Sequence, residues 1–356
     1  MVVLPPVYPA SNNERDSWIL ERRPSRAKLD PSLAYAFSLE DECSPDGEVV
    51  PVATLFLTNR ECPWRCLMCD LWRNTLRETV PLGAIPAQID HALAQLGPAK
   101  QIKLYNSGSF FDRKAIPIED YAAIAARLDS FERVIVESHP ALLRNTRKTV
   151  TVSSAPPGAS RSSFSMRRRA SAPFALPGES CLRFRDLLKG SLEVAMGLET
   201  VHPEILPRLN KRMTVEQFST AAEWLKTNGI DLRTFILIKP PFMNEEEALY
   251  WAQRSLDFAF DCGAAVASLI PTRAGNGAMD ELAARGEFAP PRIDTLEAAA
   301  AYGLSLKKGR VFADLWDLER ISTCGVCYGP RRARLNEMNL RQSLEPRVDC
   351  AVCRSK

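Results

Sequence analysis

Histidine is scarce in this chain, and both long apolar runs and a strong net charge are absent. The three histidines, His91, His139 and His202, lie too far apart in the sequence to indicate a metal triad. No apolar stretch reaches the length needed to cross a bilayer, so we expect no membrane partner. Met1–Ala10 has neither a basic start nor an apolar core, so we expect no signal peptide. A net charge of +3 does not by itself indicate a nucleic-acid partner.

Cysteine, in contrast, is concentrated in two places. The ten cysteines include one CxxxCxxC run and two CxxC pairs, a pattern typical of metal or cluster ligation in a reducing compartment. We therefore expect a cytoplasmic protein. Three cysteines lie outside these motifs and are expected to be free thiols: Cys43, Cys181 and Cys262.

The first motif places Cys62, Cys66 and Cys69 directly after the apolar run Val52–Leu57. That run is rich in β-branched and aromatic residues and predicts a buried strand, whose carboxyl end is where α/β folds place their chemistry. Three thiolates are one short of a closed zinc site or an ordinary iron–sulfur cluster. A zinc knuckle would need a fourth ligand, and no histidine or further cysteine occurs before His91.

With this spacing the chain resembles the radical S-adenosylmethionine (SAM) superfamily. The resemblance implies a 4Fe-4S cluster on the three cysteines, with SAM bound at the open iron. It further implies cleavage of SAM to methionine and a 5′-deoxyadenosyl radical, driven by an electron donor of the flavodoxin or ferredoxin type. Most members carry an aromatic residue near the adenine where this chain has Met68, a soft contact that can replace it.

Beyond the motif, strands and helices alternate, which predicts right-handed βαβ units and a parallel sheet. The predicted parallel strands are 49–57, 101–105, 133–137, 192–198, 232–238, 264–270 and 310–315, and the predicted helices are 86–96, 118–131, 214–228, 244–260 and 294–307. Thr214 with Gln217, and Asn244 with Glu247, predict capping boxes. The predicted fold class is therefore α/β. The resemblance implies a partial (β/α)6 TIM-type barrel, although periodicity alone does not exclude a doubly wound sheet.

Three domains are predicted. Residues 1–48 form an N-terminal surface lead-in, with a short helix at 12–23, and a hairpin arm; residues 49–318 form the barrel, and residues 319–356 form a small C-terminal module. A low-complexity insertion at about 144–180 interrupts the barrel. A disordered insertion, a basic arm that touches nucleic acid and a frameshifted stretch are the alternatives for it.

Candidate cofactor-binding residues lie at the strand ends. They are Asn106, Ser107, Gly108 and Ser109 in the place of a glycine-rich motif that contacts the SAM amino group, Glu199 near the ribose, Lys211 and Arg212 for the SAM carboxylate, Ile238 for the adenine, and Arg273 for an anion or the substrate. The resemblance implies those at 106–109, Glu199 and Ile238, whereas the positive charge of the other three makes them candidates. Glu199 as a surface carboxylate, and Lys211 with Arg212 as a helix cap, are the alternatives.

The C-terminal pairs Cys324–Cys327 and Cys350–Cys353 have the spacing of a four-thiolate metal site. A structural zinc ribbon and an auxiliary iron–sulfur cluster are both compatible with these ligands. Five arginines between the pairs would suit phosphate contacts, or would form a solvated surface.

Within the superfamily, the chain is similar to the radical SAM subunit of archaeosine synthase. The similarity rests on Leu104–Asp112, Gly197–Thr200, Pro271–Gly277 and the terminal cysteines. It implies a radical enzyme that acts on a modified base in tRNA, with a partner enzyme subunit. A radical enzyme on a small metabolite, and a noncatalytic zinc or iron–sulfur protein that binds RNA, are the alternatives.

Overall fold

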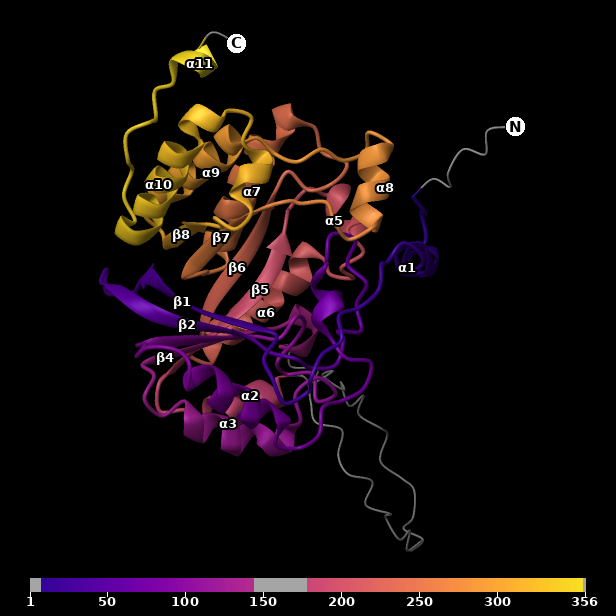
Figure 1. Ribbon diagram of the computed structural model, residues 1–356, viewed down its shortest axis with the longest axis vertical. Coiled ribbons are helices and arrows are strands. Elements are labelled where there is room, and N and C mark those ends of the chain that lie inside the picture. Colours follow the sequence, from indigo (N-terminus) through magenta and orange to yellow (C-terminus); the bar gives the residue numbers. More distant parts are fainter. Residues whose placement is uncertain (1–7, 144–177, 355–356) are drawn as a thin grey trace, which may run out of the picture.

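The computed structural model describes residues 8–143 and 178–354, and one eight-stranded sheet organises them (Figure 1). The strands are β1 (Ala36–Cys43), β2 (Val49–Phe56), β3 (Gln101–Tyr105), β4 (Arg133–Glu137), β5 (Ser191–Glu199), β6 (Asp231–Ile238), β7 (Val266–Pro271) and β8 (Arg310–Ala313). Strand β1 pairs antiparallel with β2, and every later pair is parallel. The spatial order follows the sequence from β1 to β8, without the reversal of a doubly wound sheet. The predicted partial barrel is confirmed.

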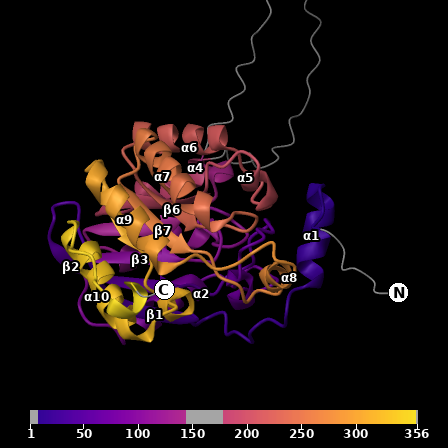
Figure 2. The ribbon, with the colours of Figure 1, turned by 90° about the horizontal axis from the view of Figure 1, so that it is seen from above.

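The α-helices of the described ranges are α1 (Asn12–Glu21), α2 (Ala84–Leu93), α3 (Tyr121–Arg127), α4 (Glu179–Arg185), α5 (Ile205–Arg208), α6 (Val215–Thr227), α7 (Glu245–Asp261), α8 (Ala278–Ala284), α9 (Ile293–Leu306), α10 (Gly325–Arg341) and α11 (Ala351–Arg354). Helices such as α6, α7, α9 and α10 pack against the sheet, whereas α1 and α8 lie to one side of it (Figures 1 and 2). The main core lies between helices and strands, with residues such as Leu55, Ile102 and Val136 fully buried. No helix in the described ranges has the length and apolar character required to cross a membrane.

Local sequence signals place several helix boundaries correctly. Thr214 and Gln217 form both bonds of the predicted capping box at the start of α6. At α7 the structure shows one of the two bonds, in which the Asn244 side chain accepts from the Glu247 backbone. The helices α4, α5, α8, α10 and α11 were not predicted. At α8 the capping signal was present, because the Asn276 side chain accepts from the Met279 N–H at 2.7 Å.

The N-terminal lead-in packs on the rest of the molecule. Helix α1 lies beside α8 in both views (Figures 1 and 2). Trp18 and Ile19 of α1 are buried in a cluster with Leu67 of the three-cysteine loop and Met279 of α8. The segment before the barrel therefore covers the predicted cluster site.

The predicted insertion lies mostly outside the described residues, but its ends are visible. The Gly178 backbone N–H donates to the Leu142 carbonyl at 2.8 Å. The described residues on either side of this segment therefore lie next to each other, between β4 and α4.

The C-terminal module is helical rather than a zinc ribbon. Residues 324–341 form a cap and the long helix α10, and Cys350 precedes the short helix α11. The ribbon fold predicted for this module is wrong, because cysteine spacing reports ligand identity and leaves the backbone between the pairs undetermined.

A network of buried charged side chains lies near the amino ends of the parallel strands, where the antiparallel β1 ends. Arg233 of β6 is 2% exposed and pairs with Glu42 of β1, and with Glu193 of β5 at 2.6 Å. Lys103 of β3 also pairs with Glu42. Burial by itself would raise the pKa of Glu42, but Arg233 and Lys103 outweigh it and hold this pKa at about 2. The network joins strands that are distant in the sequence.

A carboxylate with a lowered pKa stabilises the fold above its ordinary pKa of 4.5 and loses that effect as the pH falls towards 2. We expect Glu42→Gln to lower the free energy of unfolding by about 3 kcal/mol at neutral pH. The difference from the wild type should shrink through the acid range, because protonated Glu42 resembles glutamine. Urea unfolding between about pH 6 and about pH 3 measures this. Glu223→Gln, on the exposed face of α6, should show a small difference at every pH.

Candidate metal and cofactor site

The three-cysteine loop follows β2 and is held by residues from two distant loops. The Leu67 N–H donates to the Leu209 carbonyl at 2.9 Å. The Asn210 amide donates to the Arg65 carbonyl at 2.7 Å. The Asn276 amide donates to the carbonyls of Leu67 and Cys69 at 2.8 and 3.1 Å. These bonds fix the backbone on which the thiols are carried, as a preorganised ligand loop requires.

The thiols of Cys62, Cys66 and Cys69 share one electrostatic environment. Burial raises the pKa of all three thiols, to about 12 for Cys69. The nearby Lys211 ammonium opposes this effect on the pKa of both Cys62 and Cys66. The sulfur atoms do not form a tight group of the kind that a single ion needs.

The loop after β3 lies against the three-cysteine loop. A Cβ added at Gly108 would lie 3.1 Å from the Cys62 Cβ, so the close approach depends on glycine. The Glu137 carboxylate at the end of β4 accepts from the backbone N–H groups of Asn106 and Gly108 at 2.6 and 3.2 Å. Ser109 Oγ accepts from the His139 N–H at 2.8 Å. The structure therefore brings the predicted glycine-rich motif to the first cluster cysteine.

Asn106 is the clearest sign of a missing polar ligand. Its side chain is fully buried, and both amide atoms, Oδ1 and Nδ2, lack a hydrogen-bond partner. A buried amide without partners costs stability, so native structures rarely retain one without a ligand or water. A ligand with both donors and acceptors, such as the methionine end of SAM, fits this position.

Glu199 and Lys211 form a buried ion pair beside the loop, with 2.5 Å between Oε1 and Nζ. Gly197 makes room for it, because a Cβ there would collide with both groups. Burial lowers the pKa of Lys211, but Glu199, Cys66 and Cys62 together outweigh this and raise it. The ammonium therefore stays charged between a carboxylate and the thiols of Cys66 and Cys62.

Several residues at this edge have left-handed backbone conformations, which side chains other than glycine rarely adopt. Ser107, Glu199 and Lys239 follow or end β3, β5 and β6 with φ values of 55°, 66° and 53°. Asn210 and Arg212 have φ values of 55° and 60°. Such strain concentrates at functional sites, because the surrounding structure must hold it in place.

His139 has a structural role here. Its ring stacks on Trp64 of the three-cysteine loop, with 3.8 Å between centroids. Its Nδ1 accepts from the Ala141 N–H at 3.1 Å, so the Nε2 proton can be donated to the Lys211 carbonyl at 3.0 Å. The ring thus supports the loop that carries Lys211.

Met68 and Arg273 line one cavity of about 110 Å³ above β6 and β7, together with Asp70. Arg273 pairs with Asp314 at 2.7 Å and so extends towards β8. The Ile238 carbonyl already accepts from the Thr272 N–H and hydroxyl.

Arg212 lies apart from the other predicted cofactor ligands. It pairs with Asp16 of α1 at 2.8 Å and donates to the Asn12 carbonyl. The structure therefore brings together the cysteines, residues 106–109, Glu199 and Lys211, and it directs Arg212 to the N-terminal helix.

Sequence reasoning missed the residues that hold the site: Trp64, Glu137, Asn210 and Asn276. Glu137 ends a predicted strand, which is the one signal that could have marked it. Asn210 and Asn276 lie in loops, where asparagine ordinarily indicates a turn. Their partners lie about 145 and 207 residues away in the chain, so no local pattern identifies them.

The C-terminal thiols form the second candidate site. The sulfur atoms of Cys324, Cys327, Cys350 and Cys353 all lie within 4.8 Å of one another. The separation is 3.9 Å between Cys324 and Cys350, and 3.6 Å between Cys327 and Cys353. The predicted four-cysteine group is confirmed.

The chain was compared with family models and with the sequences and structures of known proteins. No family model matches the chain. An uncharacterized protein of Methanocaldococcus jannaschii is 23% identical over 287 residues, covering 76% of this chain and 70% of that protein. Archaeosine synthase subunit beta of Methanosarcina acetivorans is 25% identical over 281 residues, covering 76% and 72%.

Among solved structures, archaeal Methanocaldococcus infernus Elp3 with an N-terminal deletion matches with a TM-score of 0.47 at 15% identity. That match covers 71% of this chain, which spans 59% of the Elp3 chain. The similarity to archaeosine synthase that was predicted from the sequence is confirmed by the sequence match to its subunit beta.

The hydrogen bonds from Asn276 predict a specific defect. In Asn276→Ala the carbonyls of Leu67 and Cys69 lose their donor, so we expect lower iron content after anaerobic reconstitution and about tenfold faster cluster loss to a chelator. Iron and sulfide analysis and the decay of visible absorbance measure both effects. Asn339→Ala is the matched control, because Asn339 bonds both backbone groups of Ala313 at distant β8. Equal loss in the two variants would contradict the assigned role of Asn276.

Proposed function

We propose that this chain, which resembles the radical SAM superfamily and is similar to archaeosine synthase subunit beta, is a radical SAM enzyme. One observation carries the proposal. A loop with three thiols, and no fourth in its motif, lies at the carboxyl edge of a parallel sheet beside the partnerless amide of Asn106. A 4Fe-4S cluster on Cys62, Cys66 and Cys69 would keep one iron open for SAM.

The chain's own residues would bind and orient these cofactors. The chemistry supplied by the bound cluster and SAM is reductive cleavage of SAM to methionine and a 5′-deoxyadenosyl radical. Asn106 and the backbone of residues 107–109 would hold the polar methionine end. Lys211 would supply a fixed positive charge beside the thiolates, with Glu199 as its partner. Met68 would contact the adenine from the wall of its cavity.

We further propose a modified tRNA base as the substrate and a second enzyme subunit as a partner. The support is sequence similarity to a protein named as a subunit of archaeosine synthase. The C-terminal arginines give this little support. Arg331 and Arg334 are engaged with Glu297 of α9, and Arg341 pairs with Glu337. A reducing compartment such as the cytoplasm, and an electron donor of the flavodoxin or ferredoxin type, complete the proposal.

The C-terminal thiols are proposed to hold zinc rather than a second cluster. A zinc–sulfur bond of about 2.3 Å gives a tetrahedron with edges of about 3.8 Å. The separations of 3.9 and 3.6 Å match that edge. A four-iron cube is larger than one ion and would hold its thiolates farther apart.

The central proposal predicts the outcome of a cysteine series. Cys66→Ala should abolish the formation of 5′-deoxyadenosine from SAM by reduced, reconstituted enzyme, because two thiolates cannot hold the cluster. Cys181→Ala, at a fully buried free thiol, should retain cleavage after any loss of stability. Colourless wild-type protein after anaerobic reconstitution, or cleavage by Cys66→Ala, would refute the proposal. Product analysis with bulk tRNA then tests the substrate.

The zinc assignment predicts the metal content. We expect about one zinc per chain after purification, and its retention when Cys62, Cys66 and Cys69 are all replaced by alanine. Cys350→Ser should lose the zinc and lower the unfolding temperature of the protein. Elemental analysis and thermal unfolding measure these effects. Iron that remains in the triple variant and disappears with Cys350→Ser would show a second cluster instead.

A further inference from the structure

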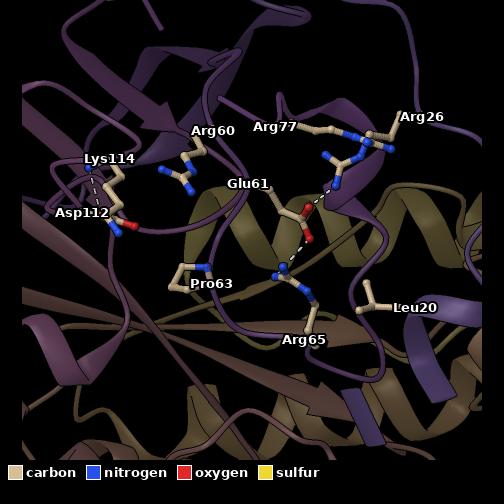
Figure 3. A pocket seen from close by; sticks show the side chains of 9 residues that line it. All are labelled: Leu20, Arg26, Arg60, Glu61, Pro63, Arg65, Arg77, Asp112 and Lys114. Carbon is tan, nitrogen blue, oxygen red and sulfur yellow. Dashed lines mark hydrogen bonds and ion pairs between the residues drawn. The ribbon is translucent and has the colours of Figure 1, made fainter. Parts of the chain in front are cut away.

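A large basic pocket adjoins the three-cysteine loop on a side that the proposed function does not use. Its volume is about 480 Å³. Figure 3 shows its lining: Leu20, Arg26, Arg60, Glu61, Pro63, Arg65, Arg77, Asp112 and Lys114. Five of these side chains are cationic and two are anionic.

The two acidic groups of the pocket differ. Glu61 is paired with cations, whereas Asp112 is bonded to an uncharged backbone N–H and so still offsets part of the positive charge. Glu61 pairs with Arg23 at 2.7 Å and with Arg65 at 3.1 Å, and it also pairs with Arg26. Asp112 accepts from the Lys114 backbone at 2.9 Å.

Three cations of the pocket stay uncompensated. Arg60, Arg77 and Lys114 form no ion pair with a carboxylate in ranges 8–143 and 178–354. A concave surface with uncompensated cations concentrates the positive potential and attracts an acidic partner.

The pocket contacts the ligand loop directly. Pro63 in its wall follows Cys62, and Arg65 donates to the Cys62 carbonyl at 2.5 Å. The cavity beside Met68 is different, because strand-end residues of β6 and β7 line it. No residue lines both cavities. The amino-terminal half of the loop therefore faces the basic pocket, and the carboxyl-terminal half faces the strand ends where SAM and substrate are proposed to bind.

We propose that the basic pocket docks an acidic one-electron carrier protein. The inference rests on the proposed function, because cleavage of SAM needs one electron for each turnover. The carrier is oxidised by one electron at this surface, and the group held by the three cysteines is reduced by one. The site suits this role because electron transfer weakens steeply with distance, and the pocket wall includes the residues that flank Cys62. The strand-end side stays free for the substrate.

The experiment distinguishes a loss of carrier binding from a loss of SAM cleavage. Arg77→Glu combined with Lys114→Glu reverses two exposed pocket charges outside the three-cysteine loop. Lys100→Glu combined with Lys226→Glu is the matched control: it makes the same charge change at exposed positions, one just before β3 and one on α6. Each protein is assayed for 5′-deoxyadenosine formation, first with dithionite and then with reduced flavodoxin or reduced ferredoxin. Binding of oxidised flavodoxin is measured separately by calorimetry at several salt concentrations.

With dithionite, the pocket variant should match the wild type. With a protein donor, its rate should fall about tenfold at low salt, and its affinity for flavodoxin should weaken by a similar factor, with a smaller salt dependence. The control should behave as the wild type in every assay.

Equal rates with a protein donor for the wild type and the pocket variant would overturn the docking proposal. Unchanged donor-driven cleavage together with lost tRNA binding would also overturn it, and would assign the pocket to nucleic acid. Failure of the wild type to cleave SAM with dithionite would instead refute the proposed function itself.

Discussion

The structure depends on how one short loop is held. A segment with three thiols at spacings of four and three residues has no regular secondary structure of its own, so its carbonyl groups need donors from elsewhere. Asn210 and Asn276 supply them, since their side-chain amides reach the carbonyls of residues 65, 67 and 69. The two asparagines lie beyond β5 and β7, so the ligand loop keeps its shape only when the strands of the partial barrel have assembled.

One end of the barrel stabilises the fold, and the other carries residues whose conformations or missing hydrogen bonds cost stability. At the amino ends of the strands, Arg233, Glu42 and Glu193 satisfy one another's charges in the interior and link β1, β5 and β6. At the carboxyl ends, the left-handed conformations of Ser107 and Glu199 and the partnerless amide of Asn106 cost stability. Such separation is typical of parallel barrels, where one end stabilises the fold and the other carries the chemistry.

The two sets of cysteines show the same division between stabilising the fold and carrying the chemistry. Cys324, Cys327, Cys350 and Cys353 close to the dimensions of one tetrahedral ion, which ties α11 to the start of α10. The loop of Cys62, Cys66 and Cys69 instead lies between the strand ends on one side and the basic pocket on the other, and its motif supplies three thiols. A closed set of ligands stabilises a fold, whereas an open set leaves room for a reactant.

The sequence by itself determined the features that are local in the chain. Cysteine spacing identified both thiol groups, and the alternation of strands and helices predicted a parallel sheet, because these signals lie within a few residues of one another. The choice of a partial barrel over a doubly wound sheet came from the family resemblance. The sequence did not show that α1 covers the loop, that Arg212 turns to Asp16, or that Glu137, Asn210 and Asn276 hold the site. Those contacts join residues that are distant in the chain, so only the tertiary structure could decide them. The basic pocket has the same origin, since its walls come from four separate segments that meet once the barrel has formed.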